Sequence, residues 1–171
     1  MHMKRLIPLV AAATLTGPLM LVGQSVSAST PGGLVHVYDV NPGTGSTGSV
    51  VVTGAFADSG TDQSGVSSNA NRIVLSEGTF EVNTSAIQKK FSTAKPKGNP
   101  ANCGVVLAAT APATLFNGTG AYKGITGKVT LNITSAAVLP TKSNGKCDES
   151  PSSVAVGEVT ISQGSGTISF K

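Results

Sequence analysis

Short runs of β-branched and apolar residues, separated by clusters of Gly, Asn, Ser and Pro, make up almost all of the sequence after residue 28. Hardly any stretch has the 3.6-residue apolar repeat of an amphipathic helix. The run 127–139 alternates most clearly, with Val129, Leu131 and Ile133 on one face. Seven or eight runs at near-regular spacing predict an antiparallel barrel or sandwich. The expected strands are 34–40, 50–58, 72–84, 103–116, 127–139, 153–162 and 166–170.

The segments between and within these runs give further expectations. The polar stretch 59–71 is expected to be a loop, and 85–92 to form one or two helical turns. Within the runs, Pro112 is expected to interrupt a strand and Gly78 to mark a bulge or bend. The Gly/Ser stretch 164–166 is expected to be a turn between the last two strands.

Glycines inside or beside the strands favour a barrel over a sandwich. Barrel corners need such residues to coil tightly, and closure removes exposed strand edges. We therefore expect an all-β fold, an up-and-down antiparallel barrel of eight strands. The glycines concerned are Gly54, Gly78, Gly157 and those in 118–127, and the expected lumen lining includes Val51, Phe56, Val74, Phe80 and Val82.

The first residues have the pattern of a secretory signal peptide. Lys4 and Arg5 precede an apolar stretch, 6–23, and Val26-Ser27-Ala28 supplies the small residues of a cleavage site. We expect 1–28 to be the signal peptide, 29–171 to be a single barrel domain with a loop insertion near 85–103, and the protein to be extracellular. An uncleaved membrane anchor is the alternative interpretation, and after cleavage no membrane association is expected.

Charge and cysteine content limit the classes of partner. The whole chain has a net charge of +4, which falls to +2 when Lys4 and Arg5 are removed, so nucleic acid is not an expected partner. In an exported protein, Cys103 and Cys147 are expected to form a disulfide, with two free thiols as the alternative. A catalytic cysteine is not expected, because the only histidine after residue 28 is His36.

Several short motifs lack the context that their chemistry needs. The GxGxxG match at 43–48 precedes a β run and not a helix, so no dinucleotide site is expected. Asp58 and Asp62 could begin a calcium loop, but a solvated turn is favoured because no glutamate follows. The glycine-rich segment 117–127 lacks the end of a phosphate-binding loop and is expected to bend the chain, with Tyr122 over one end of the lumen. No metal or other cofactor is expected.

Three stretches resemble the dirigent and allene oxide cyclase superfamily, most closely its secreted bacterial, actinobacterial members. They are NGTGAYKGITGKVTL, VTGAFADSGTD and NRIVLSEGTFEV, in matching order over residues 50–133. The resemblance implies an eight-stranded barrel that forms dimers or trimers. In plants such barrels guide radical coupling or cyclise an epoxide without a cofactor. This chain differs in its few aromatic residues, its insertion near 85–103 and its expected disulfide.

Three functions remain open from the sequence. The first is binding of a small apolar or amphipathic molecule in the barrel. The second is a cofactor-free isomerase or cyclase, or a dirigent-like guide, which needs a buried carboxylate of raised pKa. Its weak catalytic candidates are Glu77 with Arg72, brought together by a bulge, and Tyr122. The third is a structural cell-surface protein with a filled interior. The expected ligand-binding residues are Tyr38, Asp58, Arg72, Glu77 and Tyr122.

Overall fold

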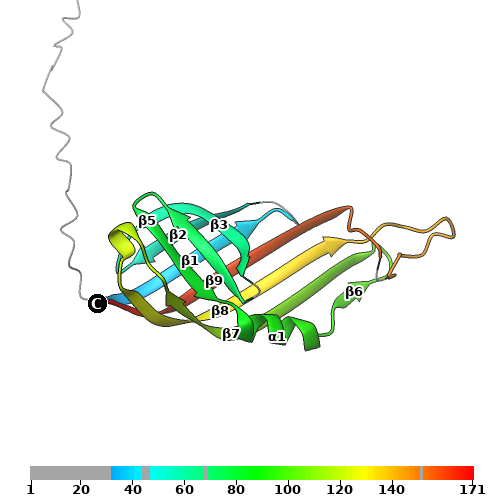
Figure 1. Ribbon diagram of the computed structural model, residues 1–171. Helices are drawn as coiled ribbons and strands as arrows, with labels where there is room; N and C mark the ends of the chain where they lie inside the picture. The colour runs from blue at the N-terminus through cyan, green and yellow to red at the C-terminus, as the bar shows by residue number, and fades with distance from the viewer. Residues whose placement is uncertain (1–31, 44–46, 68, 151) are drawn as a thin grey trace, which may run out of the picture.

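The computed structural model describes residues 32–43, 47–67, 69–150 and 152–171, so the expected signal peptide lies outside the described residues. Of residues 64–66 the backbone alone is described. The chain forms nine strands, one α-helix and one 3₁₀ turn in this region (Figure 1). They are β1 (Gly33–Asn41), β2 (Gly48–Gly54), β3 (Asp58–Ser67), β4 (Ala70–Leu75), β5 (Gly78–Asn83), α1 (Ser85–Thr93), β6 (Lys97–Asn99), β7 (Gly104–Phe116), η1 (Gly120–Tyr122), β8 (Ile125–Val138) and β9 (Gly157–Phe170).

Eight of these strands form a closed antiparallel barrel, as the sequence predicted. The strand order is β5-β4-β3-β2-β1-β9-β8-β7, and β5 also pairs with β7 to close the sheet. Successive strands are neighbours throughout, which is the up-and-down topology. The closing seam is short, because β5 and β7 pair only over Glu81–Asn83 and Thr114–Phe116 in the described chain. β6 is an additional strand that pairs with the start of β7.

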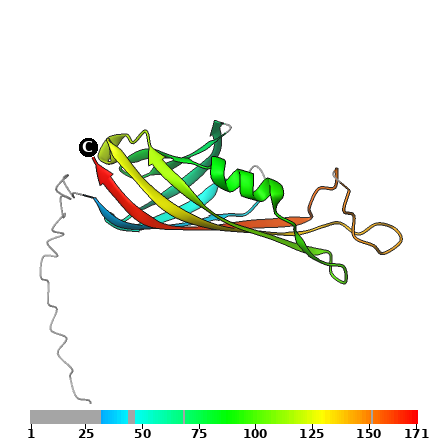
Figure 2. The same cartoon turned by 90° about the horizontal axis from the view of Figure 1, so that it is seen from below.

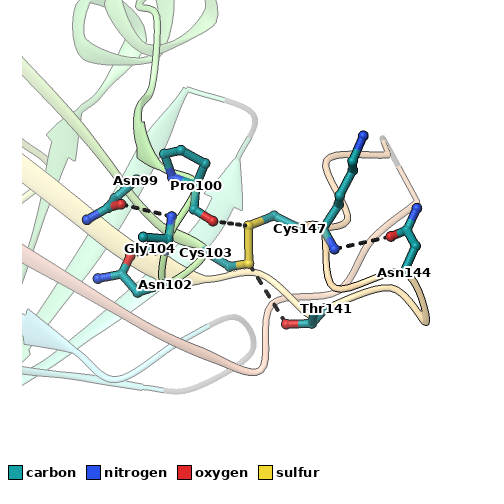
Figure 3. The surroundings of a disulfide bond; sticks show 10 residues. Asn99, Pro100, Asn102, Cys103, Gly104, Thr141, Asn144 and Cys147 are labelled. Carbon is teal, nitrogen blue, oxygen red and sulfur yellow. Dashed lines mark hydrogen bonds between the residues drawn. A yellow bond between two sulfur atoms is a disulfide. The ribbon is translucent and has the colours of Figure 1, made fainter.

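Strands β7, β8 and β9 continue well past the barrel as an extended arm (Figures 1 and 2). The predicted disulfide lies on this arm and joins Cys103, just before β7, to Cys147 in the connection between β8 and β9. The carbonyl oxygen of Pro100 lies 3.6 Å from Cys147 Sγ, and Thr141 Oγ1 lies 3.9 Å from Cys103 Sγ. Figure 3 shows these residues around the disulfide. The covalent bond therefore ties the connection to the arm and not to the barrel wall.

Inward positions of the strands form the hydrophobic core. Phe80, Val82 and Phe56 pack in or against it, as expected for the lumen lining. The prediction for two valines was wrong. Val51 is 47% exposed, and Val74 is less buried than its neighbours, because the inward positions are Val50 and Val52 in β2, and Ile73 and Leu75 in β4. Alternation fixes which residues share a face, but a run apolar on both faces does not identify the inner one.

Three strand predictions need correction. The stretch 59–71 is not a loop: most of it forms β3, whose backbone pairs with β2 and β4 on its two sides. The run 72–84 is a hairpin, β4 and β5, with Ser76 and Glu77 as its two-residue turn. Pro112 does not interrupt β7, where it lies opposite Thr130. A residue without an N–H is tolerated there because the described part of β7 has no strand on its other side between residues 107 and 113.

The predicted turn at 164–166 is also absent, and β9 runs unbroken from Gly157 to Phe170. β1 and β8 pair continuously with it on both sides. The glycines serve close packing instead. A Cβ at Gly166 would lie 2.1 Å from the carbonyl oxygen of Lys128, and one at Gly164 would lie 3.0 Å from Leu131 Cδ2. They let a long strand curve tightly around the barrel.

Helix α1 confirms the predicted helical turns and covers the open part of the seam. It begins directly after β5 and packs beside β7 (Figure 2). Ile87 is buried and Phe91, one turn later, is half-buried, whereas Lys89 and Lys90 are exposed. The segment 85–103, expected as a loop insertion, therefore contains α1 and β6. Among the described residues, no helix is long and apolar enough to cross a membrane.

We predict that Gly166→Ala lowers the free energy of unfolding by about 1–3 kcal/mol, because the new methyl group overlaps the backbone of β8. Gly157→Ala is the matched control on the same strand, since nothing lies within 4 Å of its Cβ position. Denaturant unfolding followed by circular dichroism measures both variants. Equal stabilities for the two variants would contradict the close strand packing described here.

Candidate functional site

The two ends of the barrel interior differ in character. At one end, Phe56 contacts three other rings, with centroid distances of 4.8 Å to Tyr122, 6.5 Å to Phe80 and 6.4 Å to Phe170. Phe80 and Tyr122 are fully or almost fully buried. This aromatic cluster fills the interior, so we call this end the closed end. The other end contains polar inward residues and a pocket.

The glycine-rich segment 117–127 covers the closed end, as a bend and not as a phosphate-binding loop. It folds into η1 and is fixed to the β4–β5 turn, where the amide of Ala121 donates to the carbonyl oxygen of Glu77 at 2.9 Å. Gly120 has a φ of 58°, and a Cβ there would lie 2.2 Å from that same oxygen. This close approach places Tyr122 inside the closed end of the barrel, buried among aromatic rings and not near an opening as a ligand-binding residue would be.

Asp58 is bound into the closed end and is not part of a solvated turn, which corrects the interpretation of 58–62. The Tyr122 hydroxyl donates to Asp58 Oδ2, and Ser76 Oγ donates to Oδ1 at 2.6 Å. Burial alone would raise the pKa of Asp58, but these bonds and the amides of Ser59 and Glu77 lower it to about 2. Burial and the Asp58 carboxylate raise the pKa of Tyr122. The pair stays as carboxylate and phenol, which is a structural role.

The other predicted site residues do not gather around a common point. Arg72 Nη2 lies 3.0 Å from Glu81 Oε1 on the paired strand, so its partner is Glu81 and not Glu77. Glu77 is exposed in the β4–β5 turn, with no bulge to bring it to Arg72. Tyr38 is 46% exposed on the outer face of β1. Of the five predicted ligand-binding residues, Asp58 and Tyr122 are joined through their side chains, and Glu77 reaches Asp58 through its backbone amide.

The open end of the barrel holds a pocket of about 590 Å³ that opens to solvent. Its walls come from β1, β3, β4, β8 and β9, and α1 closes one side. Both apolar and polar side chains line it, which is the usual composition of a small-molecule site. The lining residues that matter below are Asp39, Asp62, Asn71, Ile87, Phe91, Ile133, Ser135, Glu158 and Ser162.

Two buried carboxylates, Asp39 on β1 and Asp62 on β3, form the most unusual part of this pocket. Each side chain is only 7% exposed. Both lie beside Gly48 on the intervening strand β2: a Cβ there would be 2.4 Å from Asp39 Oδ1 and 3.4 Å from Asp62 Cβ. A glycine at this position thus leaves space for the carboxylates. We call Asp39 and Asp62 the acid pair.

The acid pair is incompletely hydrogen-bonded within the described chain. Asn71 Nδ2 donates to Asp62 Oδ2 at 3.0 Å, and Ser162 donates to Asp39. No described residue donates to Oδ1 of either aspartate. Burial, and then the nearby charge of Asp39, raise the pKa of Asp62 from 3.8 to about 6. Burial also raises the pKa of Asp39. Buried carboxylate oxygens without donors are rare in folded proteins because they are destabilising.

Sequence reasoning missed the acid pair, although part of the signal was present. Asp39 follows Val35 and Val37 at two-residue spacing, so it belongs to the same face of β1 as a core residue. An acidic residue in that position is a candidate for a buried functional group. Asp62 gave no comparable signal, because β3 is too polar to be recognised as a strand from its sequence. His36, on the outer face of β1, is half-buried.

The chemistry open to the pocket follows from its lining. Its charged members are Asp39, Asp62 and Glu158, and no lysine, arginine or histidine is among the described lining residues. Within the described chain no three His, Cys, Asp or Glu side chains are grouped to hold a metal ion. The pocket is therefore suited to a molecule with hydrogen-bond donors or positive charge, and an aspartate of raised pKa can exchange a proton near neutral pH.

Comparisons with known proteins do not assign this site. The chain matches no family model, no curated protein and no solved structure.

We predict that Asp62→Asn stabilises the protein at pH 7.5 by about 3 kcal/mol and leaves its stability at pH 4 unchanged. A carboxyl whose pKa is raised by folding stabilises the native state while protonated. That contribution is lost as the pH rises from about 4 through 6. The wild type should therefore become less stable over this range, and the variant should lose less. Urea unfolding at several pH values measures this.

Asp148→Asn is the control, because it removes the same charge from an exposed ion pair with Lys142 on the arm. Its stability at pH 7.5 should be equal to the wild type or slightly lower. If Asp62→Asn behaved in the same way as Asp148→Asn, Asp62 would not be a desolvated carboxylate.

Proposed function

We propose that this protein is a secreted barrel that binds a small amphipathic molecule in the pocket at the open end. The observation that carries the proposal is a pocket of about 590 Å³ lined by two buried carboxylates, each with one oxygen to which no described residue donates. A solvent-exposed polar patch would satisfy these groups with water, and a structural core would replace them with apolar side chains. Keeping them at the expense of stability is typical of functional sites.

The division of the interior supports binding over a purely structural role. A filled interior is what the structural hypothesis requires, and the closed end has it. The open end instead combines an apolar wall, formed by Ile87, Phe91 and Ile133, with polar groups from β1, β3 and β9. An amphipathic ligand matches that combination, since its apolar part can be buried against the wall while its polar part reaches the acid pair.

The proposal of an extracellular location rests on two observations. The first residues have a signal-peptide pattern. The disulfide between Cys103 and Cys147 is typical of oxidising compartments. We retain membership of the dirigent and allene oxide cyclase superfamily, and assembly into dimers or trimers, as part of this proposal. The closed eight-stranded barrel supports the superfamily assignment at the level of fold.

A second function, a cofactor-free isomerase or cyclase, is favoured by one observation. The pKa of Asp62 is raised to about 6 by burial and by Asp39, which places it in the range of a general acid or base near neutral pH. The residues would be Asp62 as proton donor or acceptor and Asp39 as the charge that tunes it. The sequence-based candidates Glu77 and Arg72 have no part in this version, because neither lines the pocket.

We predict that the wild-type protein binds Nile red, a neutral apolar dye, and that n-octanol displaces it. Ser135→Phe should reduce dye affinity at least about tenfold, because Ser135 lines the pocket and the ring occupies part of its volume. Dye fluorescence titrations measure the affinities. Native mass spectrometry of protein from its natural source tests for a co-purifying molecule.

Ser165→Phe is the matched control. Ser165 is exposed on β9, and inward and outward residues alternate along that strand, so the added ring lies outside the barrel. Its dye affinity should equal that of the wild type. Absence of dye binding and of any co-purifying molecule, or equal losses in both variants, would reject the proposed binding site.

A further inference from the structure

We infer that the ligand of the open-end pocket is an organic cation: a protonated primary or secondary amine carried on an apolar body. This inference rests on the proposed binding function and names its ligand class. It is drawn from the unused hydrogen-bonding capacity of the acid pair, the sign of the charge around the pocket and the position of its apolar wall.

The first argument is the number and kind of missing partners. Asp39 Oδ1 and Asp62 Oδ1 belong to side chains that are more than nine-tenths buried, both line the pocket, and no described residue donates to either. Both atoms are acceptors, so the missing groups must be donors. A protonated primary amine has three N–H donors, and a secondary one has two. Either places N–H donors and a positive charge beside the acid pair, whose negative charge no cationic side chain of the described lining offsets.

The second argument is electrostatic. The titratable groups facing the pocket are Asp39 on β1, Asp62 on β3 and Glu158 on β9. The two lysines nearest in sequence to the apolar wall, Lys89 and Lys90 of α1, are exposed and do not line it. Charges of one sign within low-dielectric walls attract a ligand of the opposite sign and repel one of the same sign. The pocket therefore selects against carboxylates and phosphates.

The third argument distinguishes an organic cation from a metal ion. A bare ion needs several ligands at short distance, and the described residues hold no cluster of three or more suitable side chains. The pocket volume of about 590 Å³ is suited to a molecule of many atoms. Ile87 and Phe91 of α1, with Ile133 of β8, provide apolar surface for an alkyl or aromatic body.

The test compares four probes with the same eight-carbon chain and different head groups. They are octylamine, octyltrimethylammonium, octanol and octanoate, titrated into the wild-type protein at pH 7.5 by isothermal calorimetry. We expect octylamine to bind roughly 10- to 100-fold more tightly than octanol, the range of a charge-assisted hydrogen bond. Octyltrimethylammonium, which has the charge but no N–H, should bind more weakly than octylamine, and octanoate should bind most weakly.

Variants test whether the acid pair causes the preference for octylamine over octanol. Asp39→Asn and Asp62→Asn should each reduce octylamine affinity about tenfold and leave octanol affinity within about twofold. Asp148→Asn, on the arm, removes the same charge away from the pocket lining and should change neither. Circular dichroism checks that each variant is folded. The ranking of the four probes on the wild-type protein needs no variant and tests the inference by itself.

The outcomes separate this inference from the proposed function. If octanol binds as tightly as octylamine, the binding function stands and the amine inference is wrong. A preference for octanoate, equal affinities for the two ammonium probes, or loss of amine binding in Asp148→Asn to the same degree as in the acid-pair variants would also overturn the inference. If none of the four probes binds and Nile red does not bind, the proposed function itself fails.

Discussion

The short pairing between β5 and β7 is the constraint on which the rest of this structure depends. Closure of an eight-stranded sheet requires the last strand to meet the first, and here the described contact covers only Glu81–Asn83 and Thr114–Phe116. Next to the closed end the two strands join directly. Farther along, β5 ends and α1 lies beside β7 in its place. A helix cannot continue the hydrogen-bonded ladder, so the wall there depends on packed side chains such as Ile87.

This asymmetry explains why one barrel has two different interiors. At the closed end, Phe56 with its three neighbouring rings and the bound pair of Asp58 and Tyr122 fill the space, as expected for an eight-stranded barrel whose lumen is just wide enough for side chains. At the open end, β5 and β7 no longer pair, α1 lies beside β7 instead, and the inward side chains of the strands become polar. The pocket exists where the sheet does not close on itself. The helix that covers the seam also provides the apolar part of the pocket wall.

The acidic residues illustrate how one residue type has opposite roles in one barrel. Asp58 and Asp62 are four residues apart on β3, so both face inward. Asp58 accepts bonds from the Tyr122 and Ser76 hydroxyls and from three backbone amides, and its pKa falls to about 2. Asp62 is more deeply buried, has one side-chain donor and lies near a second carboxylate, and its pKa rises to about 6. The first arrangement stabilises the native state above pH 4, and the second destabilises it near neutral pH. The first arrangement therefore has a structural role, and the second belongs to the pocket for which we propose ligand binding.

The sequence by itself determined the fold class and the disulfide partners. These depend on local chemistry: the two-residue alternation of 127–139, glycine where the backbone must bend, and a single cysteine pair. Tertiary structure alone decided the rest. β3 is a strand because β2 and β4 supply its hydrogen bonds. β9 continues without a turn at Gly164 and Gly166 because β1 and β8 pair with it on both sides. Asp39 and Asp62 lie close together on either side of Gly48. Their proximity depends on the register of β1 and β3 against β2. Local propensity carries no information about the register between strands. The fold class could therefore be predicted from the sequence, and the site could not.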